Sequence, residues 1–183
     1  VSKSKYVFKC GCDDISYVER YTYLGVVLTE FLDFDIMAKA SAQSASRALR
    51  LLIAKSKLFG GFAFDVYTKL YDSLVRPILD YSAGIWGNKS YSCINAVQNR
   101  AMRFFLGVGK YTPTDALYGE TGWIPPLVDQ WTCISRLYAR LSSTSDDRIN
   151  KRIAIWALSK ASHRCKNWFY SANRKSVSLD INA

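Results

Sequence analysis

The spacing of the apolar residues changes near residues 33–36, and this change constrains the fold more than any other feature of the sequence. Before it, the segment "KYVFKCGCDDISYVERYTYLGVVL" alternates aromatic and β-branched residues with polar ones, which is typical of paired strands. After it, apolar residues recur at the 3.6-residue spacing of amphipathic helices. The sequence therefore predicts a mainly α fold, in which a short N-terminal β-hairpin precedes a helical bundle.

The strands of this hairpin are expected over residues 5–10 and 16–28, with residues 11–14 as the turn between them. Adjacent aspartates such as Asp13 and Asp14 also occur in the metal-binding cores of polymerases. Two-metal catalysis needs carboxylates from two separate strands, however, and only twelve residues precede Asp13. We therefore expect no second carboxylate strand and interpret the pair as part of a turn.

Helices are expected over residues 36–58, 64–86, 90–106, 112–119, 127–142 and 148–161. Pro77 should bend or interrupt the second helix, because proline lacks the backbone N–H that a helical turn requires. The expected division is a hairpin domain over 1–34, a helical domain over 35–142, and a C-terminal helical extension with a polar tail over 143–183.

The first expected helix has two distinct faces at 100° per residue. The apolar face consists of Ala38, Ala42, Ala45, Leu49, Leu52 and Ile53. The opposite face, called here the polar stripe, consists of Lys39, Gln43, Ser46, Arg50 and Lys57. The first face should pack, and the polar stripe should point to solvent or to a ligand.

The net charge of +10, from 25 Lys and Arg against 15 Asp and Glu, favours polyanionic partners and nucleic acid above all. Residues 36–110 contain eleven Lys and Arg against three Asp, so most of the excess lies in the expected helices. The alternative is a basic surface that only keeps the protein soluble.

No cofactor or metal site is predicted. The five cysteines lack the spacing of a disulfide framework or zinc module, and Cys10 and Cys12 lie far along the chain from the single histidine, His163. Free thiols and the absence of an apolar run of about 18 residues favour an intracellular protein, nuclear or cytoplasmic, with no membrane partner. Four tryptophans stand among apolar residues and are expected in the core: Trp86, Trp123, Trp131 and Trp156.

Three blocks occur in the order "YTYLGVVLTEFLDFD", "LYDSLVRPILDYSAGIWG" and "VQNRAMRFFLGVGKYTPTDALYGETGWIPP". Together they resemble the C-terminal part of the reverse transcriptase of non-LTR (LINE-type) retrotransposons. The first block is similar to the hairpin that ends the palm and grips the primer, with Tyr23, Leu24 and Gly25 at its motif. The other two are similar to the helical thumb that follows.

The resemblance implies a thumb that contacts the backbone of RNA, DNA or an RNA–DNA hybrid without reading its sequence. Tyr23 would then contact a primer end, and Asn99, Arg100 and Arg103 would add phosphate contacts to those of the polar stripe. The catalytic palm and fingers of that family are missing, so we expect no enzyme activity. Two alternatives remain open: a helical protein-interaction module, which would bind a protein or itself through exposed apolar surface, and a remnant without a selected function.

Overall fold

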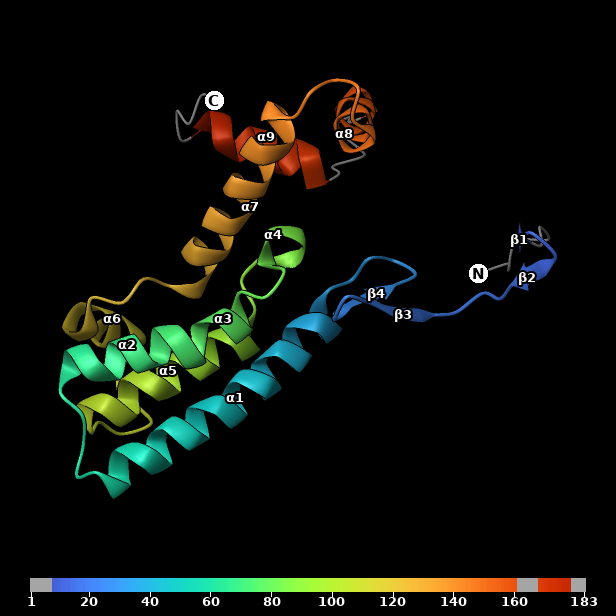
Figure 1. The fold of residues 1–183 in the computed structure, drawn as a ribbon. Helices are drawn as coiled ribbons and strands as arrows, with labels where there is room; N and C mark the ends of the chain where they lie inside the picture. The colour runs from blue at the N-terminus through green and yellow to red at the C-terminus, as the bar shows by residue number, and fades with distance from the viewer. Residues whose placement is uncertain (1–7, 161–167, 179–183) are drawn as a thin grey trace. The chain divides into compact units, whose positions relative to one another are not determined.

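The structure, a computed structural model, describes residues 8–160 and 168–178. The chain divides into two compact units, Val1–Met37 and Ala38–Ala183, which we call the N-terminal unit and the helical unit. As predicted, the fold is mainly α: short antiparallel strand pairs come first and helices follow (Figure 1). Within the described residues, no strand follows residue 40.

The first strand pair corrects the prediction for residues 5–28, because two hairpins stand where one was expected. Strand β1 (Phe8–Cys10) pairs with β2 (Asp13–Ile15), and the turn between them needs only two residues. Asp13 and Asp14 therefore lie in a strand and not in the turn. Asp14 lies opposite Lys9, and its Oδ1 is 3.5 Å from the lysine Nζ.

The second hairpin joins β3 (Arg20–Tyr23) to β4 (Val26–Thr29) through another two-residue loop. Both loop residues, Leu24 and Gly25, have positive φ angles of 46° and 77°. This pattern defines the type I′ turn, whose twist matches that of the flanking strands. Glycine adopts such a φ angle without strain, whereas leucine does so at a cost.

The helices form the larger unit, and they largely follow the predicted ranges. They are α1 (Asp35–Leu58), α2 (Phe64–Leu74), α3 (Arg76–Leu79), α4 (Ala83–Trp86), α5 (Ser92–Leu106), α6 (Thr114–Thr121), α7 (Pro126–Ser143), α8 (Ile149–Ser159) and α9 (Trp168–Ser178). None of these helices is long and apolar enough to cross a membrane.

The expected helix over residues 64–86 is interrupted, as the proline predicted. Helix α2 ends at Leu74, and Pro77 stands in the first turn of α3, where its missing N–H needs no partner. A second break lies at Ser82, whose φ angle of 56° is left-handed. Helix α6 runs past the predicted end at Gly119 and stops before Gly122, which has the left-handed φ angle of a helix C-cap.

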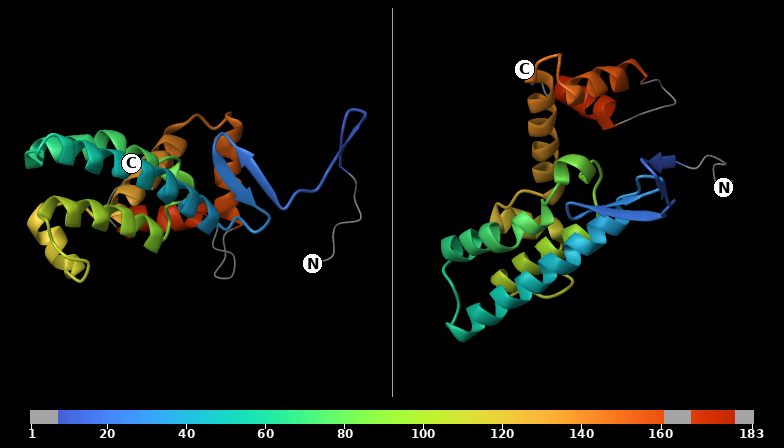
Figure 2. Two further views of the ribbon diagram at one scale, coloured as in Figure 1. Left: turned by 90° about the horizontal axis from the view of Figure 1, so that it is seen from below. Right: turned by 45° about the vertical axis from the view of Figure 1, so that its right-hand side comes forward.

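Helices α1, α2 and α5 run side by side in the helical unit (Figures 1 and 2). Their core contains a stack of aromatic rings, in which the centroids of Tyr71 and Trp123 are 4.4 Å apart. Two buried hydroxyls join α2 to α5: Tyr67 donates to the carbonyl oxygen of Ala101, and Tyr71 donates to Oε1 of Gln98. Burial and hydrogen bonding together fix α5 beside α2.

The C-terminal helices differ most from the prediction. Helix α9 covers residues for which no helix was predicted. Its Ala172 is buried, and Trp168 Nε1 donates a 2.9 Å hydrogen bond to the carbonyl oxygen of Gly84, so α9 packs on the helical unit. The expected burial of Trp156 is wrong, because 62% of this residue is exposed. His163, the end of the helix predicted over 148–161, and most of the final tail lie outside the described residues.

The large apolar residues of α8 do not pack on the rest of the helical unit. Ile149, Ile153 and Trp156 are all exposed, and Ala154 is the buried residue of this helix. Periodicity identifies an apolar face but does not say whether that face or a face of small residues packs on the protein. Here the small side packs and the large side chains remain uncovered.

A cluster of charged side chains joins α2, α3 and α7. Arg76 Nε lies 3.3 Å from Asp72 Oδ1 and 3.6 Å from Asp129 Oδ2, without the geometry of a hydrogen bond. Burial, with the nearby Asp129 carboxylate, raises the pKa of Asp80 to about 6. Burial also raises the pKa of Asp129, which Arg76 opposes. Arg76 therefore compensates only part of the negative charge of Asp72, Asp80 and Asp129.

Candidate nucleic-acid interface

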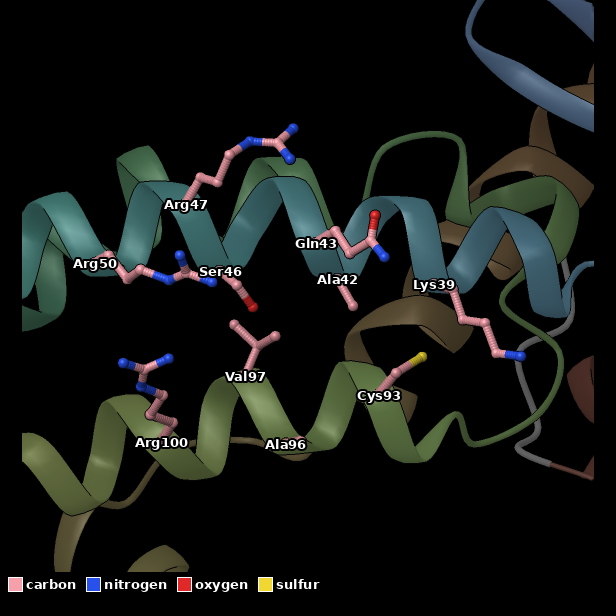
Figure 3. A pocket seen from close by; sticks show the side chains of 10 residues that line it. All are labelled: Lys39, Ala42, Gln43, Ser46, Arg47, Arg50, Cys93, Ala96, Val97 and Arg100. Atoms are coloured by element: carbon pink, nitrogen blue, oxygen red, sulfur yellow. The ribbon is translucent and has the colours of Figure 1, made fainter.

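A groove of about 700 Å³ lies between α1 and α5, and it is the centre of the candidate site (Figure 3). Its two helices run in the same direction, so that Lys39 lies near Cys93 at one end and Arg50 lies near Arg100 at the other. Alanines and Val97 form part of its lining. Small side chains on the facing helices leave the space that the long cationic side chains border.

The sequence explains why α1 turns its cations to this groove. Ala42, Ala45, Leu49 and Leu52 are buried as predicted, and their burial fixes the rotation of the helix about its axis. The direction of the polar stripe is then fixed as well, because at 100° per residue its side chains lie on a different face of the same helix. Packing of the apolar face of α1 therefore determines where the side chains of the polar stripe point.

The groove is strongly positive. Four cations border it, namely Lys39, Arg47, Arg50 and Arg100, and no Asp or Glu lines it. Within the described residues, no ion pair neutralises Arg50 or Arg100. The two guanidinium groups extend from opposite helices into the same space (Figure 3). Like charges held close together repel, so an anion between them would be stabilised by both.

Five of the predicted binding residues line the groove together: Lys39, Gln43, Ser46, Arg50 and Arg100. The structure thus brings Arg100 to the same groove as Arg50, although 50 positions of the sequence separate the two residues. Gln43 and Ser46 stand between the cations of α1 and supply an amide and a hydroxyl for neutral hydrogen bonds (Figure 3).

The remaining predicted residues lie elsewhere. Lys57 is exposed, but it lies near the end of α1, beyond the groove lining. Asn99 is half-buried on α5 outside that lining, and Arg103 donates from Nη2 to the carbonyl oxygen of Thr112, 3.1 Å away. Arg103 therefore anchors the loop after α5. Tyr23 is exposed at the second hairpin of the N-terminal unit.

Two groove residues, Arg47 and Cys93, were not predicted from the sequence. Arg47 follows Ser46 in the sequence and lies about 100° away from it around the helix, which is why the stripe did not include it. It donates a 2.9 Å hydrogen bond from Nη2 to Ser44 Oγ. Cys93 belongs to α5, and no pattern in the sequence indicated that this helix would face α1 there.

The arrangement suits an anionic polymer more than a metal ion. Among the described residues, no cluster of three or more His, Cys, Asp or Glu side chains could hold a metal. The groove instead offers cations, neutral hydrogen-bonding groups and an open, elongated shape, which match a chain of phosphates and sugars.

No family model matches the chain, and no significant match was found among the curated proteins or the solved structures. The resemblance to the thumb of non-LTR reverse transcriptases therefore rests on the three sequence blocks alone.

Proposed function

We propose that this protein binds nucleic acid through the sugar–phosphate backbone, as a thumb does, without catalysing a reaction. The observation that carries the proposal is the convergence of Arg50 and Arg100 on one groove that no acidic residue lines. Two guanidinium groups across a groove bind phosphate oxygens by charge-assisted hydrogen bonds and release counterions from the polymer.

The same groove explains why binding would be independent of sequence. Gln43 and Ser46 lie on a helix that also carries the phosphate-binding cations, so their hydrogen bonds would fall on sugar and phosphate oxygens near the backbone. Such contacts fix the position of a duplex but do not distinguish its bases. The ligand class is therefore RNA, DNA or an RNA–DNA hybrid of any sequence.

The test is binding of a short RNA–DNA hybrid over a series of salt concentrations. The triple variant Lys39→Ala/Arg50→Ala/Arg100→Ala should bind weakly, and the slope of log K against log salt should become shallower by about 2 to 3, because up to three phosphate contacts are lost. Unchanged affinity and slope in this variant would refute the proposal.

A charge-matched control separates the groove from the general positive charge of the protein. Three exposed cations lie outside the groove: Arg140 in α7, Arg152 in α8 and Lys160 directly after α8. The variant Arg140→Ala/Arg152→Ala/Lys160→Ala loses the same charge and should keep most of its affinity. Equal losses in both variants would show that only net charge matters.

Cys93 provides a second test that does not depend on substitution. Its half-buried thiol lines the groove, whereas Cys10 and Cys12 are exposed in the N-terminal unit. A hybrid bound in the groove should slow alkylation of Cys93, measured by mass spectrometry of its peptide. The alkylation of Cys10 and Cys12 serves as an internal reference, and equal protection of all three thiols would contradict binding in the groove.

A second candidate function, protein interaction, is favoured by the exposed face of α8. Ile149, Ile153 and Trp156 lie on one side of this helix and are 73%, 60% and 62% exposed. Replacing all three with serine should abolish any concentration-dependent self-association seen by sedimentation, and it should leave hybrid binding unchanged. If the wild-type protein stays monomeric and binds the hybrid, the nucleic-acid proposal stands alone.

A further inference from the structure

The groove between α1 and α5 leads to a second exposed surface at the end of the helical unit. Because the two helices run in the same direction, both end beyond the Arg50 and Arg100 end of the groove (Figure 3). The loops that follow them, residues 59–63 and 107–113, lie at that end and are called here the tip loops (Figures 1 and 2).

Glycines shape both tip loops. Gly60 and Gly61 have φ angles of 75° and 105°, and a Gly at position 107 has a φ angle of 66°, which are conformations that other residues rarely adopt. The chain can therefore turn sharply directly after each helix. Two aromatic residues remain outside: Phe59 is 67% exposed and Tyr111 is 92% exposed.

A cation stands beside one of the exposed rings, and another cation lies close to the second ring in the sequence. Lys57 precedes Phe59 by two residues, and Nζ of Lys110 lies 5.9 Å from the centre of the Tyr111 ring. Neither tip loop contains Asp or Glu, and the nearest acids in sequence stand in the first turns of α2 and α6. Aromatic rings next to cations are the combination that binds single-stranded nucleic acid, since each base can stack and each phosphate can pair.

We propose that the tip loops bind the unpaired bases of a strand whose neighbouring part lies in the groove. This inference rests on the proposed function and narrows the ligand to a nucleic acid with a single-stranded extension beside a duplex. Helix α1 continues for eight residues from Arg50 to Leu58, about 12 Å at 1.5 Å per residue. A strand covers this length in roughly three to four nucleotides at about 3.4 Å each, so an extension of that length reaches the rings.

The experiment compares one RNA–DNA hybrid in three forms: blunt, with a six-nucleotide 3′ extension, and with a six-nucleotide 5′ extension. One of the extensions should tighten binding at least about fivefold, because each stacked base contributes substantially to affinity. The double variant Phe59→Ala/Tyr111→Ala should lose this gain and should bind the blunt hybrid as the wild type does. Trp156→Ala removes an exposed aromatic residue of α8 and should keep the gain.

A fluorescent base in the extension reports stacking directly. 2-Aminopurine placed four nucleotides from the duplex should be quenched when the wild-type protein binds, and it should be quenched less by the double variant. If the blunt hybrid binds with the expected salt dependence but no extension adds affinity, the tip inference is overturned and the groove proposal stands. If no form of the hybrid binds, both are overturned.

Discussion

Asp80 is a half-buried carboxyl group at the end of α3, and replacing it with asparagine should stabilise the helical unit at neutral pH. Burial and the Asp129 carboxylate raise its pKa from 3.8 to about 6, although Arg76 acts in the opposite direction. The folded protein therefore resists the ionised form of this group.

The sign of the effect follows from the two pKa values. Between about pH 4 and pH 6, the folded state holds a proton on Asp80 that the unfolded state has released, so the free energy of unfolding falls as the pH rises. Above pH 6 the full penalty is present. The rise to about 6 corresponds to at most about 3 kcal/mol, and partial exposure to solvent reduces the expected value to about 1 to 2 kcal/mol.

Urea denaturation from pH 4 to pH 8 measures this effect. The Asp80→Asn variant should be more stable than the wild type by about 1 to 2 kcal/mol at pH 7, and its stability should depend less on pH. Asp146→Asn, in the exposed turn before α8, is the matched control and should behave as the wild type. A variant that is less stable at pH 7, or that retains the full pH dependence, would refute the assignment.

Three further predictions concern packing, the hairpin and catalysis. A Cβ at Gly87 would lie 2.7 Å from a backbone oxygen of α4 and from a side-chain carbon of α7. Gly87→Ala should therefore lower the free energy of unfolding by about 1 to 3 kcal/mol. Gly119→Ala is the control: a Cβ there has no neighbour within 4 Å, and the variant should raise the free energy of unfolding by up to about 1 kcal/mol. Leu24→Asn should slow amide hydrogen exchange in the second hairpin, because asparagine tolerates the left-handed conformation better; faster exchange would contradict the strain argument. The purified protein should not extend a primer on a template with Mg²⁺ or Mn²⁺, and extension abolished by Asp13→Asn/Asp14→Asn would show that these exposed aspartates are catalytic.

The rotation of α1 could be predicted from the sequence, whereas the groove could not. Regular burial of Ala45 and Leu49 follows from local spacing, and the direction of Lys39 and Arg50 follows from that burial. The position of Arg100 opposite Arg50 depends on how α2 turns the chain back and where α5 packs, which no local pattern specifies. Helical spacing indicated Arg50 and the family resemblance indicated Arg100, but tertiary packing decided that they share a groove.

The errors have the same origin. Two hairpins replaced one because two residues are enough for a turn, and alternation of apolar and polar residues does not mark where one hairpin ends. Trp156 was expected in the core because it stands among apolar residues at helical spacing, yet spacing says nothing about what covers a face. The phosphate contact of Arg103 stays a prediction, but its hydrogen bond to a loop carbonyl could not be predicted, because that bond depends on the path of the loop.

The aromatic core gives the helical unit its own optical signature. Residues 1–37 contain no tryptophan, so all five tryptophans of the protein lie in the helical unit, with Trp123 stacked on Tyr71 at 4.4 Å. Fluorescence excited selectively at tryptophan therefore reports the unfolding of the helical unit alone, because the tyrosines of the hairpins do not contribute to the signal. A difference between the transition seen by tryptophan and the loss of amide protection in the hairpins would then measure how independently the two units melt.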